Sequence, residues 1–357
     1  MKAGMTMEEM AAELMRQSQA KQDFIFSSPQ LEFTAYETGM ILRILDADGA
    51  DYIEPLELSE NAHRQIGARL SIPAKYYDRM KENYPELLAQ NVNSWFHKEP
   101  ANRMVRTMDG MARAFLSDSY RRIDHLLVAQ AVMPVIGGIE DVRFESCQIT
   151  ESQMYLKIVN PHLEAEIREG DIVQAGLVVT NSEVGTGSFC VQPMLYRLRT
   201  QAGMIDTPSQ IRRIHKGRVN TVDVNTMLAP ETELSLADRT FLEAIQETVR
   251  TAVNYSDFQN AVQTMRNAAA AQMNTDNVPL VVQRASREFG VTDVENDGVL
   301  HRLVEDNDLT LYGLSNAVAR HSQDVPDYDR ATELEAIGYN MLTMTGQQWN
   351  RLNQAAA

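Results

Sequence analysis

Arginine is the residue type with the clearest chemical potential in this sequence, because it is concentrated in two segments. The chain has 33 Lys and Arg residues, of which seven are lysines. Between residues 197 and 218 six basic residues stand against one acid, and between residues 98 and 122 six stand against three. A guanidinium group binds phosphate through two parallel hydrogen bonds and stacks on bases. Both segments are therefore candidates for contact with a nucleic-acid backbone.

We predict that ten of these residues bind nucleic acid, and a competing interpretation stays open. Under that interpretation the same side chains pair with acidic residues of this chain or of a second subunit. Sequence distance alone does not choose between the two. The ten residues are Arg103, Arg113, Arg121, Arg122, Arg197, Arg199, Arg212, Arg213, Lys216 and Arg218.

The overall charge limits the kind of nucleic acid that the protein could coat. The chain has 357 residues, 33 of them basic and 49 acidic, and a formal net charge of −16. Proteins that coat duplex DNA usually carry net positive charge, so this class is disfavoured. Twelve acids and only three arginines lie between residues 288 and 335. That region is expected to compete with DNA for the basic surface or to recruit a basic host protein.

The pattern of apolar residues indicates that α+β architecture positions the basic segments. An apolar stripe predicts an N-terminal helix within residues 1–25. Alternating and β-branched stretches in residues 26–200 are typical of an antiparallel sheet body with flanking helices. Residues 201–232, rich in Thr, Pro and Gly, are expected to be a basic loop. Residues 233–357 predict an all-helical, acidic C-terminal region.

Three shorter patterns add local detail. Asp109-Gly110 between two alternating stretches predicts a hairpin with a type I′ turn. Residues 62–77 indicate two helices joined by a tight turn; the spacing is similar to that of a DNA-reading helix-turn-helix, but we favour a structural helical hairpin. The polar run 181–188 fits either a hairpin loop with positive φ at its glycines or a cation or phosphate site.

The motifs predict no catalytic residue and no metal site. The sequence has no P-loop, no lysine preceded by an acid two positions earlier, and no histidine at zinc-ligand spacing from another His or Cys. Cys147 and Cys190 lie in predicted strands and are expected to be buried. Two cysteines, no secretory signal and no long apolar run predict a cytoplasmic protein without a membrane span. We favour a binding protein over an enzyme, with no cofactor beyond Mg²⁺ as a counterion.

Three passages together resemble the phage/plasmid-like DUF932 domain proteins. The middle passage contains the run Asn181-Ser-Glu-Val-Gly-Thr-Gly-Ser. The resemblance implies the context of a phage or mobile element inside a host cell. The function of that family is unknown, so the resemblance assigns no catalytic residue. The passages are residues 62–77 with 88–95, residues 180–188 with 196–198, and residues 311–320 with 328–335.

Two functions of different kinds fit these observations. The first is a phage DNA-metabolism protein that binds single-stranded DNA and acts in recombination or annealing, with Tyr120, Phe189 or Tyr196 stacking on bases. The second is a protein-binding inhibitor or DNA mimic that acts on a host enzyme through the acidic surface. Annealing factors commonly assemble, so the first function also leads us to expect a homo-oligomer.

Overall fold

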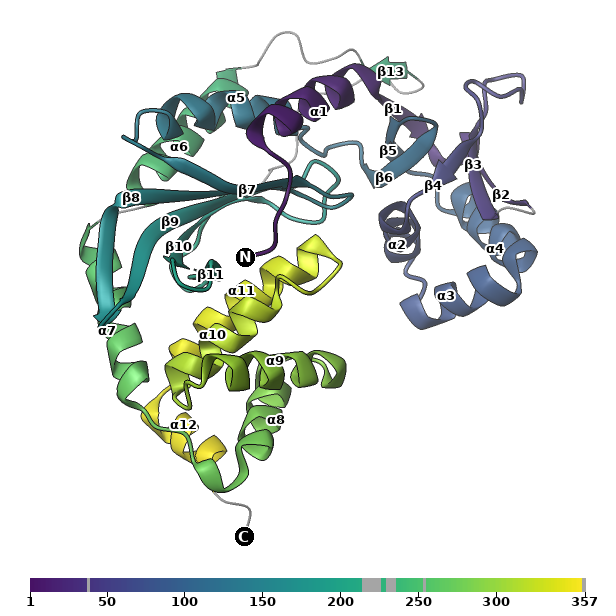
Figure 1. Ribbon diagram of the computed structural model, residues 1–357. Helices are drawn as coiled ribbons and strands as arrows, with labels where there is room; N and C mark the ends of the chain where they lie inside the picture. The colour runs from purple at the N-terminus through teal and green to yellow at the C-terminus, as the bar shows by residue number, and fades with distance from the viewer. Residues whose placement is uncertain (37–38, 214–225, 229–235, 253–254, 355–357) are drawn as a thin grey trace.

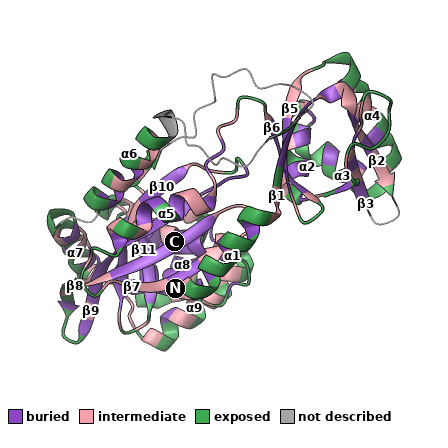
Figure 2. Ribbon diagram, turned by 90° about the horizontal axis from the view of Figure 1, so that it is seen from above, coloured by how far each residue is buried: buried purple, intermediate pink, exposed green. Residues whose placement is uncertain are grey.

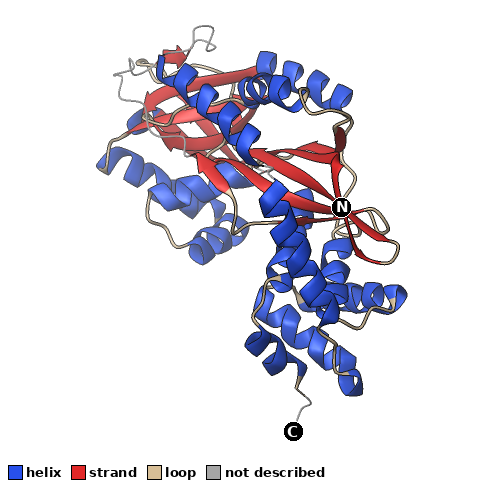
Figure 3. Cartoon of the chain, turned by 90° about the vertical axis from the view of Figure 1, so that its left-hand side faces the viewer, coloured by secondary structure: helices blue, strands red, loops and turns tan. Residues whose placement is uncertain are grey.

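The chain forms an arch with a lobe at each end and a sheet between them (Figure 1). The structure, a computed structural model, describes residues 1–36, 39–213, 226–228, 236–252 and 255–354. Antiparallel strands, flanking helices and a helical C-terminal region confirm the expected α+β class (Figure 3). The strands of the predicted sheet body are divided between two separate sheets.

The N-terminal lobe is a seven-stranded sheet with three helices on one face. Its elements are β1 (Lys21–Ser27), β2 (Leu31–Tyr36), β3 (Gly39–Ile44), β4 (Leu56–Leu58), β5 (Asn102–Met108), β6 (Met111–Ser117), β13 (Thr226–Leu228), α2 (Glu60–Arg69), α3 (Ala74–Asn83), α4 (Pro85–Lys98) and the short 3-10 helix Ser28–Gln30. The strand order is β13-β1-β5-β6-β4-β3-β2, antiparallel except for the parallel pair β4–β6. Phe24 and Phe33 of the strands pack against Ile66 and Val92 of the helices.

Two local predictions are confirmed in this lobe. β5 and β6 form a hairpin around Asp109 and Gly110, whose φ angles of +53° and +77° are those that a type I′ turn requires. α2 and α3 are joined by a tight turn in which Ser71 has a φ of +56°. Gly67 of α2 lies against the ring of Tyr77 in α3, where a Cβ would come within 3.1 Å. Close packing of the two helices explains the small residue.

The second sheet is buried on both faces. Its strands are β7 (Arg143–Ile149), β8 (Met154–Arg168), β9 (Asp171–Asn181), β10 (Phe189–Arg197), β11 (Ala202–Ile205) and β12 (Ile211–Arg213). They run antiparallel in the order β11-β10-β9-β8-β7, with β12 also paired to β10. Side chains alternate between faces, so Leu177 and Val179 of β9 join one core and Val178 joins another. Burial on both sides explains why β9 is apolar without polar alternation.

Helices cover both faces of the second sheet (Figures 1 and 2). On one face lie α1 (Met7–Ala20), α5 (His125–Ile136) and α6 (Leu236–Ala252). The other carries the C-terminal helices, in which every residue of α10 from Leu311 to Ala319 is buried. They are α7 (Tyr255–Ala270), α8 (Val278–Phe289), α9 (Asp293–Asp306), α10 (Leu311–His321), α11 (Tyr328–Leu342), α12 (Gly346–Asn353) and the 3-10 helix Thr275–Asn277.

The segment 201–232, expected to be a loop, contributes short strands to both sheets. β11 and β12 extend the second sheet, and β13 pairs with β1 of the first. Each has three or four residues, which is too short for an alternating pattern to be recognised. Both cysteines are buried, as expected. None of the described helices has the length and apolar character needed to cross a bilayer.

Candidate functional site

Three of the ten predicted nucleic-acid ligands are buried in ion pairs. Arg113, Arg122 and Arg197 expose 8%, 9% and 4% of their surface. Arg197 holds Asp171 with two hydrogen bonds, from Nε to Oδ1 at 2.6 Å and from Nη2 to Oδ2 at 2.7 Å. The prediction for these three residues is wrong, because a buried guanidinium held by a carboxylate does not face an incoming phosphate. These three residues instead fit the competing interpretation, in which the arginines pair with acidic residues of this chain.

The other seven predicted residues fall into three groups by exposure. Two are half-buried, two are exposed, and three have side chains outside the described residues. Arg121 stacks on the ring of Phe241, 4.8 Å from its centroid, and Arg212 donates to Ser188 Oγ at 3.3 Å. The half-buried residues are Arg103 and Arg121, and the exposed residues are Arg199 and Arg212. The three whose side chains lie outside the described residues are Arg213, Lys216 and Arg218.

The aromatic residues of β10 belong to the protein core. Phe189 and Tyr196 expose 0% and 5% of their surface and pack on opposite faces of the second sheet. The prediction that they stack on bases is therefore wrong, because the sheet that carries them is covered on both faces. Tyr120 is half-buried, and its hydroxyl donates to the main-chain oxygen of Ser182 at 3.3 Å.

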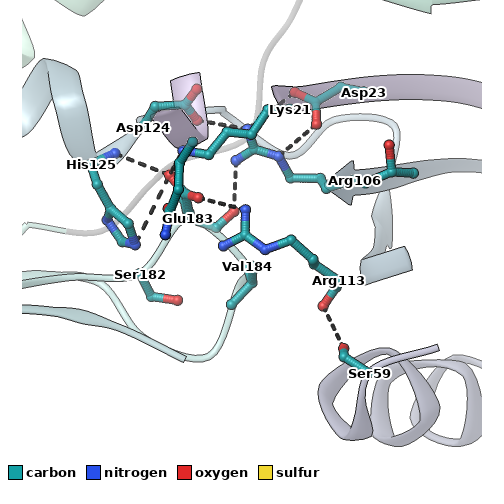
Figure 4. Close-up of polar contacts among 12 residues, drawn as sticks. Lys21, Asp23, Ser59, Arg106, Arg113, Asp124, His125, Ser182, Glu183 and Val184 are labelled. Atoms are coloured by element: carbon teal, nitrogen blue, oxygen red, sulfur yellow. Dashed lines mark hydrogen bonds and ion pairs between the residues drawn. The ribbon is translucent and has the colours of Figure 1, made fainter. Parts of the chain in front are cut away.

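A buried charge network joins the N-terminal lobe to the second sheet, with Glu183 at its centre (Figure 4). Glu183 lies in the turn between β9 and β10 and is completely buried. Its Oε2 lies 2.6 Å from Lys21 Nζ, and its Oε1 lies 2.8 Å from Arg113 Nη1. Burial works against the ionised carboxyl, but His125 and the adjoining cations hold the pKa of Glu183 well below its usual range. The charge network comprises Lys21, Asp23, Arg106, Arg113, Arg122, Asp124 and Glu183.

Arg106 links Glu183 to the other two carboxylates. Its Nε and Nη2 donate to the two oxygens of Asp23 at 2.9 and 3.1 Å, and Nη2 also donates to Asp124 Oδ1 at 2.6 Å. Its Nη1 donates to the main-chain oxygen of Glu183 at 2.7 Å. Arg122 Nη1 adds a hydrogen bond of 3.2 Å to Asp23 Oδ2. Burial opposes the charge of Arg106, but the carboxylates of Asp124 and Asp23 raise its pKa well above the usual value.

A β-bulge places Arg113 in the charge network. Arg106 pairs with Ala114 and Thr107 pairs with Ala112, so Arg113 is the extra residue of β6. A bulge bends the strand locally and re-aims the side chain at that position. The sequence gives no sign of this bulge.

The turn that carries Glu183 is held by α2 and β6. Gln65 of α2 donates to the main-chain oxygen of Val184 at 2.7 Å. Gly185 has a φ of +78°, and a Cβ there would lie 2.6 Å from Leu116 Cδ2. The run 181–188 is therefore a hairpin turn that needs glycine at position 185, and it packs against the N-terminal lobe.

His125 adds a neutral group beside Glu183. Its Nδ1 accepts a hydrogen bond of 3.0 Å from the Asn181 amide, which leaves the proton on Nε2, 4.0 Å from Glu183 Oε2. Its main-chain N–H donates to Glu183 Oε2 at 3.1 Å. Burial lowers the pKa of His125 to about 4, so the ring is neutral at pH 7.

The charge network can hold the two sheets in a fixed position relative to each other. The carboxylates of Asp23 and Glu183 have little capacity left for other ligands. Each oxygen of Asp23 and Glu183 already accepts at least one hydrogen bond. A cleft of about 430 Å³ beside the network is lined by Lys21, Asp23 and Asp124. Buried ion pairs of this kind are costly to break, because removal of one partner leaves an uncompensated charge.

Two arginines that form no ion pair with another described residue lie on the N-terminal lobe. Asn61, Gln65 and Arg69 follow one another at intervals of four along α2 and so share a face. Arg69 is exposed and lies near Arg103 of β5. Burial and the positive charge of Arg69 lower the pKa of Arg103, which the exposed Asp118 offsets only in part. Neither arginine forms an ion pair with another residue in the part of the chain that the structure describes.

The N-terminal lobe carries further polar and aromatic groups that are exposed or lie opposite Arg103. Ser117 lies opposite Arg103 across the β5–β6 ladder, and its hydroxyl is 2.9 Å from that of Ser119. Tyr76 on α3 is 43% exposed, which leaves its ring open to solvent. We call these residues, together with the exposed basic residues of α2 and α3, the lobe surface. It comprises Arg64, Arg69, Lys75, Tyr76, Arg79, Arg103, Ser117 and Ser119.

The sequence predictions did not select most residues of the charge network and the lobe surface. Counting charges along the chain selected the two segments richest in arginine, whereas Arg64 and Arg69, which form no ion pair with another described residue, lie in a segment of mixed charge. A usable signal for Glu183 existed, since Asn181, Ser182 and Glu183 are consecutive polar residues at the end of an apolar strand.

One exposed group could offer metal ligands. Among the described residues, Glu140, Asp141 and His162 have ligand atoms within 4.8 Å of one another. His162 Nε2 is 3.1 Å from Asp141 Oδ2, and both side chains are more than half exposed. The contact is a hydrogen bond on the surface in this structure.

Comparison of the chain with protein-family models, with curated proteins and with solved structures returned no match.

Proposed function

We propose that this protein binds single-stranded DNA through the lobe surface and acts in the DNA metabolism of a phage or mobile element. The pair of Arg69 and Arg103 carries the proposal. The positive charge of Arg69 acts on the guanidinium of Arg103, and a phosphate that contacts both would offset this repulsion and accept their hydrogen bonds. Arg106, Arg113 and Arg197 differ in this respect, because carboxylates already neutralise them.

The exposed ring of Tyr76 favours a single strand over a duplex. Lys75 and Arg79 lie on the same helix, so that cations and an aromatic ring occur together. Stacking of a base on an aromatic side chain contributes about 1–3 kcal/mol, and it requires a base that is not stacked within a duplex. The proposal includes a location in the host cytoplasm, Mg²⁺ only as a counterion, and homo-oligomer formation on DNA, which light scattering would detect.

Fluorescence anisotropy with a labelled oligothymidine and a duplex of equal length tests the proposal. We expect the single strand to bind more tightly, and the double variant Arg69→Ala/Arg103→Ala to lose about tenfold in affinity per guanidinium, the effect of one charge-assisted hydrogen bond. The matched control is Arg16→Ala/Arg43→Ala, which removes the same charge from arginines already held by carboxylates. Equal losses of affinity in both double variants would show that only the net charge of the protein matters, which would contradict the proposal.

A further inference from the structure

A cavity of about 520 Å³ lies in the N-terminal lobe, where α2 and α3 meet β3 and β4. His63 of α2 forms part of its wall, and Met40 and Leu58 of the strands contribute apolar side chains. A cavity of this size holds a small ligand, whose orientation is fixed by a few polar groups. The polar groups of this cavity therefore indicate which ligand fits.

His63 is a buried side chain with one ring nitrogen that has no partner. The residue is 6% exposed, and its Nδ1 lies 2.9 Å from the hydroxyl oxygen of Tyr77. Its Nε2 forms no hydrogen bond with a described residue and keeps some contact with solvent. Because the residue lines the cavity, a ligand there can meet this nitrogen.

The contact with Tyr77 determines which ring nitrogen of His63 carries the proton. Burial lowers the pKa of His63 to about 4, so the ring is neutral at pH 7 and has one N–H group. The hydroxyl of Tyr77 has no other acceptor among the described residues, so it donates to Nδ1. The ring proton is therefore on Nε2, and His63 presents an N–H donor to the cavity.

The cavity also presents carboxylates, which accept hydrogen bonds. Glu60 Oε1 is held by Lys81 Nζ at 2.6 Å. Glu57 and Glu82 are exposed and form no ion pair with a described residue. One lysine against three carboxylates leaves negative charge, which disfavours a phosphate. An ammonium group would suit the carboxylates, but it offers no acceptor to the N–H of His63.

A ligand that matches all these groups has a hydrogen-bond acceptor beside N–H donors and carries no negative charge. Guanine has this arrangement, because its carbonyl oxygen accepts while two neighbouring nitrogens donate, and the two donors match the two oxygens of one carboxylate. Its flat rings suit the apolar walls. Tyr36, which also lines the cavity, is 64% exposed and offers an aromatic ring for stacking.

We propose that this cavity binds a guanine base, whose carbonyl oxygen accepts from His63 Nε2 and whose N–H groups donate to a carboxylate of the wall. The base belongs either to a free nucleoside or to a single strand held on the lobe surface, and the second source rests on the proposed function. No residue of the cavity belongs to the lobe surface, so a nucleoside binds without the phosphate contacts made there.

Isothermal titration calorimetry with guanosine and with its 5′-monophosphate tests the cavity. We expect one guanosine to bind per chain, and the monophosphate to bind more weakly because its charge meets the carboxylates. His63→Phe/Tyr77→Phe removes the N–H donor without leaving either polar partner unpaired. It should weaken guanosine binding about tenfold, the effect of one hydrogen bond. The matched control His301→Phe, which removes an exposed imidazole from α9, should leave the affinity unchanged.

A second double variant tests the charge of the cavity without altering a buried group. Glu57→Gln/Glu82→Gln should bring the affinity for the monophosphate closer to that for guanosine. Both side chains are exposed, so the fold should not change. The proposal is overturned if guanosine does not bind, if the His63/Tyr77 variant binds it as tightly as the wild type, or if the Glu57/Glu82 variant leaves the ratio of the two affinities unchanged.

An oligothymidine that carries one guanine distinguishes the two sources of the base. Tighter binding of this strand than of pure oligothymidine, lost in His63→Phe/Tyr77→Phe, identifies a base of the bound strand. Equal binding of the two strands identifies a free nucleoside. If guanosine binds but neither strand does, the proposed function fails while the assignment of the cavity stands.

Discussion

Replacement of Glu183 by Gln tests whether the charge network holds the two sheets together. The substitution keeps the shape of the side chain but leaves Lys21 and Arg113 without their carboxylate partner, and both are less than 10% exposed. Removal of one partner of a buried ion pair costs about 3–5 kcal/mol. Because stabilities are about 5–15 kcal/mol, Glu183→Gln should remove a large part of the total.

Urea unfolding followed by circular dichroism and by tryptophan fluorescence measures this loss. The two tryptophans separate the regions, since Trp95 lies in α4 of the N-terminal lobe and Trp349 lies in α12. We expect Glu183→Gln to lower the free energy of unfolding by at least about 3 kcal/mol. The matched control is Glu333→Gln, whose carboxylate is 60% exposed in its ion pair with Arg330 and should contribute at most about 1 kcal/mol.

A second substitution separates charge from packing. Adding Lys21→Met to Glu183→Gln removes one of the stranded cations, so part of the lost stability should return. A cost below about 1 kcal/mol for Glu183→Gln, or no recovery with Lys21→Met, would refute the reasoning that uncompensated buried charge dominates at this position.

Two further predictions concern stability. Burial lowers the pKa of both His125 and His63 from 6.5 to about 4, so the unfolded chain takes up protons first as the pH falls. The stability that these neutral rings provide is complete above about pH 6.5 and is lost toward pH 4, by at most about 3 kcal/mol for each ring; urea midpoints that stay constant from pH 7 to 5 would contradict this. Gly185→Ala should cost about 1–3 kcal/mol more than Gly49→Ala, because both glycines have a φ near +80° but only the new Cβ at position 185 meets Leu116. Equal melting temperatures for these two variants would show that Leu116 moves away from the new Cβ without cost, and would contradict this prediction.

The sequence predicted those parts of the fold that depend on neighbouring residues. The N-terminal helix, the type I′ hairpin at Asp109-Gly110, the paired helices within 62–77 and the helical C-terminal region are all present. Turn chemistry and apolar periodicity act over a few residues, so a single sequence records them.

The candidate site depended on contacts between distant residues, and there the sequence mistook buried, paired arginines for DNA ligands at Arg113, Arg122 and Arg197. Arg106 meets Asp23 across 83 residues, and Arg113 meets Glu183 across 70. No local pattern indicates such a partner, so counting arginines could not separate buried pairs from free groups. The β-bulge at Arg113 and the burial of both faces of β10 likewise arise only when the sheets pack.

The salt dependence of single-strand binding tests most directly whether Arg69 and Arg103 contact phosphate. For single strands the logarithm of the association constant falls with the logarithm of salt concentration by about 0.7 for each phosphate neutralised. Arg69→Ala/Arg103→Ala should therefore reduce the magnitude of this slope by about 1.4 relative to the wild type, and Arg16→Ala/Arg43→Ala should leave it unchanged. Identical slopes for the wild type and the Arg69/Arg103 variant, or no binding by the wild type at about 50 mM salt, would contradict the account.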